Sequence, residues 1–211
     1  MALQLARHAV GPTGFVVAIS SERNLQLLRE LGADEVLDYT SFHSTIELAK
    51  ELARRYGNGS GSGSGSDENT DTNTDNDDDN KMFNVVLDTY GSQELYNACA
   101  GFLKRGGMYD AAGIHYGEYA LWPVLKSGLT LLWNAVRPQS PWLGGAGRTW
   151  KAVSMMDPPL EMMEELVRLF GEGKIRVVVD SEWPFDKVLD AYDVLLSGRA
   201  RGKILIKVAD H

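Results

Sequence analysis

The stretch Phe15–Tyr39 reads FVVAISSERNLQLLRELGADEVLDY, and it decides the fold. It opens with a short apolar run, which is typical of a buried parallel strand. Leucines at helical spacing follow, and Gly32 ends the predicted helix. A second short strand is predicted at Glu35–Leu37. This order of strand, helix and strand predicts a right-handed crossover between parallel strands.

The same alternation continues outward from this stretch. Apolar runs predict further strands at residues 85–89, 108–111, 177–179 and 204–208. Apolar stripes at helical spacing predict helices over residues 46–56, 95–102, 160–170 and 185–196. Strands joined by single helices form a parallel sheet covered on both faces. We therefore predict an α/β, doubly wound parallel sheet (Rossmann-type), forming one nucleotide-binding domain over residues 1–211.

One segment interrupts this alternation. Residues 57–80 read GNGSGSGSGSDENTDTNTDNDDDN and contain no aliphatic or aromatic side chain. Such a segment cannot bury enough apolar surface to offset its ordering entropy, so we predict a disordered, dispensable surface insertion. A calcium site is a weak alternative, because the spacing lacks the glycine and the terminal glutamate of an EF-hand loop.

Charge and hydropathy exclude two classes of partner. The formal net charge of −8 opposes binding to nucleic-acid phosphates. Seven of the acids lie in the insertion, which leaves 22 acids against 21 bases elsewhere. No run approaches the roughly 20 apolar residues of a membrane helix. We expect neither a nucleic-acid partner nor a membrane span.

The single cysteine, Cys99, lies on an apolar helical stripe and is predicted to be a core residue. One cysteine allows neither an intrachain disulfide nor a thiolate zinc cluster, so we predict no zinc site in this chain and a reducing compartment. The cytoplasm is expected, or the mitochondrion if the true N-terminus is missing. His115 follows a strand end, where this fold binds ligands, although a solvated loop histidine is the simpler interpretation.

Polar residues and glycines follow several predicted strands at their carboxyl ends. They are Ser20–Ser21, Asp38–Tyr39, Asp88–Gly91 and Ala112–Gly113. In an open parallel sheet the ligand lies in the crevice at this edge. Each of these positions could be an ordinary turn, but their common placement predicts a nucleotide site.

Several ordered motifs carry a resemblance to a known family. They are SSERN at residues 20–24, LGADEV at 31–36, DYT at 38–40, VVLDTYG at 85–91, GGMYDAAG at 106–113, LGG with an arginine at 143–148, and the tail at 171–208. Together they resemble the quinone-oxidoreductase branch of the medium-chain dehydrogenases/reductases. The resemblance covers nearly all of the chain outside the insertion. It implies an NAD(P)H-dependent oxidoreductase that transfers hydride to a carbonyl, quinone or enoyl substrate.

The resemblance also implies roles for nine residues of the cofactor site. Ser20, Ser21, Arg23 and Asn24 would border the adenosine ribose, Tyr39 the adenine, Asp88 and Thr89 the middle of the cofactor, and Ala112 and Gly113 the nicotinamide. An NAD site usually has an acid just after the ribose-side strand, whereas two serines stand here. Because an arginine fork suits phosphate oxygens, Arg23 is the predicted partner of a 2′-phosphate. NADPH is therefore predicted over NADH, although Glu22 is an unfavourable neighbour.

The chain departs from the family at its start. The family places a GroES-like substrate domain, a first strand and a Gly-rich turn ahead of the helix that residues 1–11 match. The catalytic residues therefore remain unassigned. The first strand would be central in the sheet, so strands 15–19 and 85–89 are expected to pair improperly or to be separated. We expect the 211-residue chain neither to fold robustly nor to catalyse.

Other functions stay open. A truncated, non-enzymatic relative could retain a dimerisation surface, and a homodimer is predicted through the apolar stretch Leu129–Trp133. That stretch could instead be a core strand or a buried loop. Another nucleotide fold, such as a methyltransferase, is disfavoured by the order of elements in residues 171–208.

Overall fold

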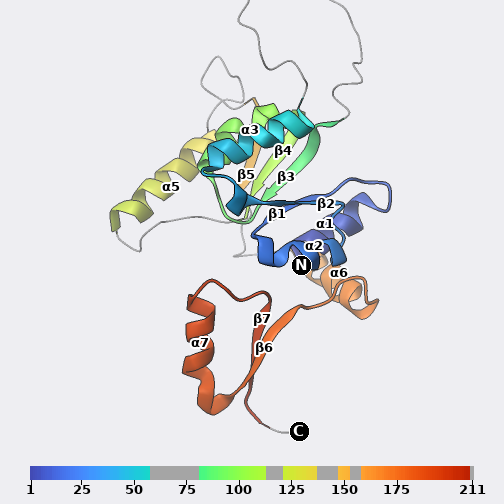
Figure 1. Ribbon diagram of the computed structural model, residues 1–211, viewed down its shortest axis with the longest axis vertical. Coiled ribbons are helices and arrows are strands. Elements are labelled where there is room, and N and C mark those ends of the chain that lie inside the picture. Colours follow the sequence, from blue (N-terminus) through green and yellow to red (C-terminus); the bar gives the residue numbers. More distant parts are fainter. Residues whose placement is uncertain (58–80, 113–120, 137–146, 153–157, 210–211) are drawn as a thin grey trace, which may run out of the picture. The chain divides into compact units, whose positions relative to one another are not determined.

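The computed structural model describes residues 1–57, 81–112, 121–136, 147–152 and 158–209 (Figure 1). Helices occupy Ala2–Val10 (α1), Leu25–Glu30 (α2), Thr45–Tyr56 (α3), Gln93–Ala98 (α4), Leu121–Val136 (α5), Leu160–Gly171 (α6) and Val188–Leu196 (α7). Strands occupy Val17–Ser20 (β1), Glu35–Asp38 (β2), Phe83–Asp88 (β3), Leu103–Ala111 (β4), Thr149–Ala152 (β5), Val179–Pro184 (β6) and Lys203–Lys207 (β7). Single 3₁₀ turns occupy Glu22–Asn24 (η1), Tyr39–Ser41 (η2), Cys99–Gly101 (η4) and Phe185–Lys187 (η6).

The strands form three parallel sheets, and the predicted α/β class with parallel pairing is confirmed. The strand orders are β1-β2, β3-β4-β5 and β6-β7, and every pairing is parallel. Among the described residues, β1 and β3 do not pair with each other. No helix in the described part of the chain is both long and apolar enough to cross a membrane.

The chain divides into two compact units. Unit 1 comprises Met1–Thr40 and Pro158–His211, and unit 2 comprises Ser41–Asp157. The single domain over residues 1–211 stays a prediction. The insertion, apart from Gly57, lies outside the described residues, as do Gly113 and His115.

Unit 2 is built around the β3–β4 pair, with α3 and α4 packed against it. Tyr56 of α3 lies against Phe83 of β3, with ring centroids 4.8 Å apart, and Tyr96 of α4 lies 5.2 Å from Tyr109 of β4. The buried side chains of this layer are Leu48, Ala49, Leu52, Tyr56, Tyr96, Cys99, Phe102, Leu103 and Tyr109. The core role predicted for Cys99 is therefore confirmed. We call these residues the unit 2 core.

The opposite face of β3 is open in the described residues. Val85 is 57% exposed and Leu87 is 44% exposed, although they alternate with the half-buried Val86 and the buried Asp88. Successive side chains of a strand point to opposite faces, so the helices of unit 2 cover one side of this strand. The sequence predicted cover on both faces.

Unit 1 contains the β1–β2 pair, α1, α2 and the C-terminal elements. Arg7 of α1 links its loops: Nε donates to the Gly32 carbonyl at 2.8 Å, a terminal nitrogen donates to the Gly14 carbonyl at 2.7 Å, and the guanidinium pairs with Asp34. Gly32 has a φ of +105°, and a Cβ there would lie 3.0 Å from the Arg7 side chain. A glycine is therefore required where the sequence predicts the helix to end.

The element boundaries differ from the predictions at several places. The helix predicted over 95–102 ends at Ala98 and continues as the 3₁₀ turn η4, and the strand predicted at 177–179 begins only at Val179. Leu129–Trp133 is neither a strand nor a loop, because it lies within α5. Strand β5 was not predicted, since TWKA shows no apolar run.

Candidate functional site

The predicted cofactor residues fall into two groups, one in each unit. Unit 1 holds a group at the ends of β1 and β2, and unit 2 holds a group at the ends of β3 and β4. The first group is Ser20, Ser21, Arg23, Asn24 and Tyr39, and the second is Asp88, Thr89 and Ala112. Gly113 lies outside the described residues.

The first group gathers two hydroxyls around one amide. Ser20 pairs with Asp38 in the parallel register, so both residues lie at the carboxyl edge of the β1–β2 sheet. Asn24, which ends η1, donates from Nδ2 to Ser20 Oγ at 3.0 Å and to Ser21 Oγ at 3.5 Å. We call Ser20, Ser21, Arg23 and Asn24 the β1-end cluster. The structure brings these four predicted residues together at one strand end.

A loop from the far end of the chain lies against the β1-end cluster. Arg23 donates to the Gly198 carbonyl at 3.4 Å, and Arg201 donates from Nε to Asn24 Oδ1 at 3.2 Å. Arg201 was not among the residues predicted from the sequence to bind the cofactor. Its signal was the basic string GRARGK at residues 198–203, but nothing local to that string indicates contact with residue 24.

Tyr39 follows β2 and presents its ring to solvent. The Asp38 carboxylate accepts hydrogen bonds from the Thr40 backbone N–H at 2.9 Å and from the Thr40 hydroxyl at 2.7 Å. This Asx-type turn fixes the backbone around Tyr39. The side chain of Tyr39 is 52% exposed, which leaves its ring open to stack on a ligand.

The second group is organised by a buried carboxylate. Asp88 Oδ1 accepts from the backbone N–H groups of Tyr90 and Gly91 at 2.9 and 2.8 Å, and Oδ2 accepts from the Ser92 N–H at 2.7 Å. The Tyr109 hydroxyl also donates to Oδ2, at 2.6 Å. Burial and then this hydrogen bond raise the pKa of Tyr109 above its ordinary value. The carboxylate thus shapes the turn after β3.

Ala112 and Thr89 lie beside that turn. The Ala112 backbone N–H donates to the Asp88 carbonyl at 2.8 Å, and this hydrogen bond joins the carboxyl ends of β3 and β4. Thr89 is exposed. Both carboxylate oxygens of Asp88 accept hydrogen bonds from within the fold. A ligand would therefore contact the neighbouring turn residues rather than this carboxylate.

The metal-binding side chains of the described residues do not fit a zinc site. No group of three or more His, Cys, Asp or Glu residues in these parts of the chain is placed to hold a metal ion. Cys99 is wholly buried, and burial raises the pKa of its thiol to about 12. A buried, protonated thiol is neither a zinc ligand nor a reactive nucleophile.

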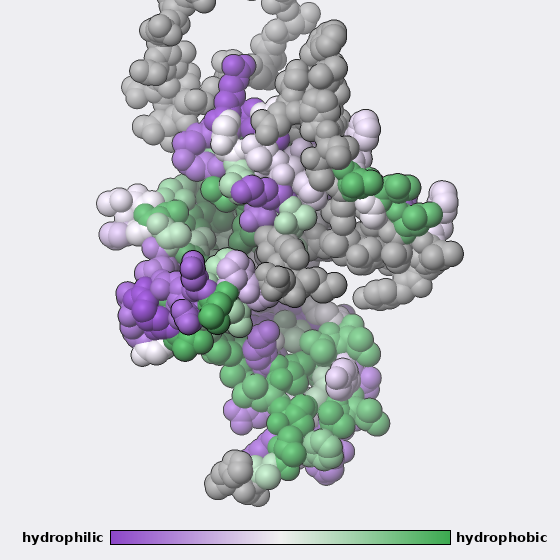
Figure 2. All heavy atoms as spheres, turned by 180° about the vertical axis from the view of Figure 1, so that it is seen from behind, coloured by the Kyte–Doolittle hydropathy of each residue, from purple (hydrophilic) through white to green (hydrophobic). Residues whose placement is uncertain are grey.

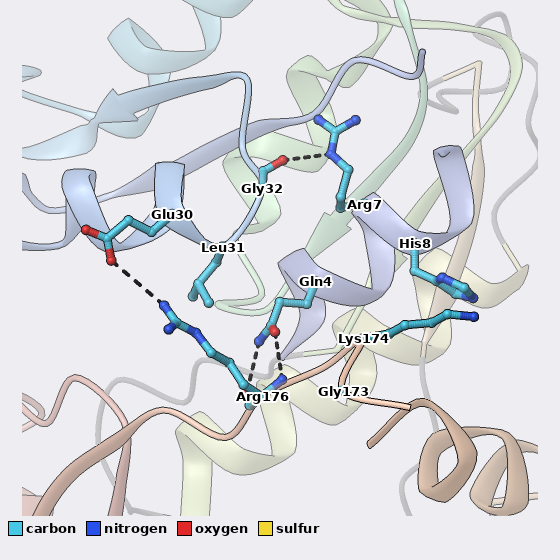
Figure 3. Close-up of a pocket in the computed structure, with 9 residues that line it drawn as sticks. All are labelled: Gln4, Arg7, His8, Glu30, Leu31, Gly32, Gly173, Lys174 and Arg176. Carbon is cyan, nitrogen blue, oxygen red and sulfur yellow. Dashed lines mark hydrogen bonds and ion pairs between the residues drawn. The ribbon is translucent and has the colours of Figure 1, made fainter. Parts of the chain in front are cut away.

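An open pocket of about 560 Å³ lies in unit 1, at the opposite edge of the β1–β2 sheet (Figure 3). Gly32, in its lining, comes before β2, whereas the β1-end cluster follows β1. Gln4 donates to the Arg176 carbonyl at 3.0 Å and accepts from its N–H at 2.9 Å, and Glu30 lies 3.8 Å from the Arg176 side chain. These groups hold α1 against the loop before β6, so the pocket is part of the scaffold rather than of the predicted cofactor site.

The chain is similar to known oxidoreductases. Residues 65–206 match the model of the zinc-binding dehydrogenase family. A trans-enoyl reductase of Penicillium oxalicum is 29% identical over 100% of this chain and 47% of that protein. A mitochondrial NAD(P)H oxidoreductase of Mus musculus is 30% identical over 92% of this chain and 41% of that protein.

A solved structure supports the fold. The quinone oxidoreductase from Coxiella burnetii matches with a TM-score of 0.58 and 19% identity, covering 99% of this chain and 48% of that one. The chain spans about half the length of the curated relatives it matches. Because the family match extends over more than half of the chain, the chain belongs to the zinc-binding dehydrogenase family, within the medium-chain dehydrogenase/reductase superfamily.

Proposed function

We propose that this chain forms the cofactor-binding part of an NADPH-dependent oxidoreductase of the enoyl or quinone reductase type. One observation carries the proposal: the β1-end cluster places two hydroxyls and an arginine where an NAD site usually has an acid. Hydroxyls and a guanidinium can donate to phosphate oxygens, whereas a carboxylate would repel them.

The residues of this chain would bind and orient the cofactor. The Ser20 and Ser21 hydroxyls, aligned by Asn24, would donate to the ribose and its 2′-phosphate, and Arg23 would pair with the phosphate charge. The exposed ring of Tyr39 would pack along the adenine. Bound NADPH would supply the hydride.

The second group would contact the rest of the cofactor. The buried Asp88 carboxylate would act by holding the turn through Thr89 against the middle of the cofactor, and Ala112 and Gly113 would lie near the nicotinamide. Because its relatives include a trans-enoyl reductase, we propose a small-molecule enoyl, quinone or other carbonyl compound as the substrate. We further propose the cytoplasm as its location, because a single cysteine favours a reducing compartment, with the mitochondrion as the alternative.

Cofactor preference tests this function directly. The dissociation constants of NADPH and NADH should be measured by fluorescence titration for the complete protein that carries this chain, and again for Arg23→Ala. We expect NADPH to bind more tightly than NADH, and Arg23→Ala to weaken NADPH by about tenfold while NADH changes little. An equal loss for both cofactors would exclude Arg23 as the 2′-phosphate partner.

We also propose a homodimer formed through α5. Such a dimer is compatible with an enzyme and also with a non-enzymatic relative that retains a dimerisation surface. The apolar side chains Trp122, Leu125, Leu129, Leu132 and Trp133 recur at helical spacing and are 50–72% exposed. A stripe of this kind is more easily explained as an interface than as a solvated surface. The mass of the complete protein at micromolar concentration tests it: a monomer, or a dimer that survives Leu129→Glu, would contradict this interface.

A further inference from the structure

The loop at residues 197–202, between α7 and β7, is held against the β1-end cluster at two points. One is the hydrogen bond from Arg23 to the Gly198 carbonyl at 3.4 Å, and the other runs from Arg201 Nε to Asn24 Oδ1 at 3.2 Å. The two partners of the second bond are separated by 177 positions in the sequence. The contact is therefore a product of the tertiary fold, and it brings a second arginine side chain to the β1-end cluster.

The backbone at Arg201 is fixed, whereas the end of its side chain is available. The Arg201 backbone N–H donates to Asp180 Oδ1 at 2.7 Å, which anchors the residue to β6. Nε is engaged with Asn24, and in the described part of the chain the two terminal nitrogens make no hydrogen bond or ion pair. Because its backbone and Nε are already held, Arg201 loses less side-chain conformational entropy than an unanchored arginine would when its terminal nitrogens bind an anion.

We propose that Arg201 is a second ligand of the 2′-phosphate and, with Arg23, determines the preference for NADPH. This inference rests on the proposed function, and it adds a residue from outside the β1 end. Arg201 orients Asn24, and Asn24 aligns the two serine hydroxyls, so one hydrogen-bonded chain joins the second arginine to the remaining phosphate donors. Two guanidinium groups also outweigh the charge of Glu22, the acid next to Arg23.

Arg199 provides a matched control for this assignment. It lies in the same loop, is exposed and carries the same charge, but it contacts the loop through its backbone N–H, which donates to Ser197 Oγ at 3.2 Å. If positive potential alone strengthened NADPH binding, the loss of either arginine would weaken binding equally. A direct contact with the phosphate would be lost only when the contacting arginine is removed.

The experiment measures binding by the complete protein that carries this chain. Dissociation constants for NADPH, NADH, 2′,5′-ADP and 5′-AMP should be determined for the wild type, Arg201→Ala, Arg201→Lys, Arg199→Ala and Arg23→Ala. We expect Arg201→Ala to weaken NADPH and 2′,5′-ADP by about tenfold, because a charge-assisted contact is lost, and to leave NADH and 5′-AMP within about twofold. Arg201→Lys should recover part of the loss, and Arg199→Ala should have little effect.

The outcomes distinguish a failure of this inference from a failure of the proposed function. If Arg23→Ala is selective for the phosphorylated ligands but Arg201→Ala weakens all four equally or none, Arg201 is only a structural contact and the inference fails alone. If Arg199→Ala matches Arg201→Ala, general charge explains both, and the inference again fails. If Arg23→Ala shows no selectivity and NADH binds as well as NADPH, the proposed NADPH function fails with it. A thermal melt of each variant without ligand identifies losses that come from unfolding.

Discussion

Helices α3 and α7 both carry clear apolar stripes, yet only α3 buries its stripe. Helix α3 buries Leu48, Ala49, Leu52 and Tyr56 in the unit 2 core. Helix α7 buries Ala191 alone, whereas Leu189 is 76% exposed and Leu196 is 79% exposed. Green apolar residues accordingly gather on the surface of this C-terminal part in Figure 2.

The difference lies in what each helix packs against. Helix α3 belongs to a unit with a three-stranded sheet, whereas α7 accompanies the two-stranded β6–β7 pair. Two strands and one helix offer too little surface to enclose a core, and such pairs are marginal alone. Periodicity in a sequence therefore predicts that a helix forms, but burial of its stripe depends on the area of the opposing surface.

The largest expected effect is the loss of a side chain from the unit 2 core. Phe102 is 1% exposed, and Phe102→Ala should lower the free energy of unfolding by about 3–5 kcal/mol, because it removes buried area and leaves a cavity. Leu189→Ala, on the exposed stripe of α7, should change it by no more than about 0.5 kcal/mol. Urea denaturation of the complete protein measures both. A large loss at Leu189 would mean that α7 is covered in solution.

A smaller loss is expected at the buried carboxylate. Asp88→Ala leaves three backbone N–H groups and the Tyr109 hydroxyl without their acceptor, and should cost roughly 2–4 kcal/mol. Tyr109→Phe removes only one of these bonds and should cost about 1 kcal/mol. If the two variants were equally stable in urea, the turn would not depend on Asp88.

The buried thiol of the unit 2 core gives a pH-dependent effect. Burial raises the pKa of Cys99 to about 12 in the folded chain, whereas an unfolded cysteine ionises near its ordinary value of about 8.5. The contribution of the protonated Cys99 thiol to the free energy of unfolding is full at pH values below that ordinary pKa. It is lost as the pH rises toward 12. Between pH 8 and pH 10, the wild type should lose about 1–2 kcal/mol of stability relative to Cys99→Ala. Parallel stability curves for the two proteins would show that the thiol is not buried.

The smallest effect is expected at exposed ion pairs, which occur in both units. Hydrogen bonds from Arg54 and then Arg55 lower the pKa of Glu51 in α3 to about 2, and Arg168 similarly lowers the pKa of Glu165 in α6. A lowered carboxyl pKa stabilises the folded state at pH values above the ordinary carboxyl pKa, which is near 4.5. This stabilisation is lost as the pH falls toward 2.

Because exposed pairs contribute little, Glu51→Gln and Glu165→Gln should each destabilise only slightly at pH 7. Their difference from the wild type should vanish at acid pH. Denaturation at pH 7 and pH 3, with carboxyl titration by NMR, measures this. A carboxyl of Glu51 that titrates at its ordinary value would contradict the pairing.

The sequence predicted those parts of the fold that depend on local pattern. The apolar run before Ser20 forms β1, Gly32 ends the α2 turn, and Cys99 is buried as its stripe indicated. Strand β5 was missed because TWKA pairs through its backbone with Met108–Ala111 and carries no apolar repeat. Pairing of that kind depends on the neighbouring strand rather than on local composition.

The candidate site was predictable to a lesser extent. A carboxylate at a strand end can face a ligand or the chain itself, and only the contacts with Tyr109 and three N–H groups reveal that Asp88 turns inward. Arg201 was missed because its neighbour Asn24 lies far away in sequence. The positions of most strands along the chain were predictable from the sequence, whereas the groups that meet at the strand ends were not.

The two units also differ in when they can form. Unit 2 is a continuous segment, Ser41–Asp157, whereas unit 1 joins Met1–Thr40 to Pro158–His211. Gln4 illustrates this, since its partner Arg176 lies 172 positions later. On the ribosome, the contacts of unit 2 can be completed while α1 still lacks its partners, because domains fold as their residues emerge. Helix α1 therefore completes its contacts only after the last quarter of the chain has been synthesised, and its side chains lack these partners until then.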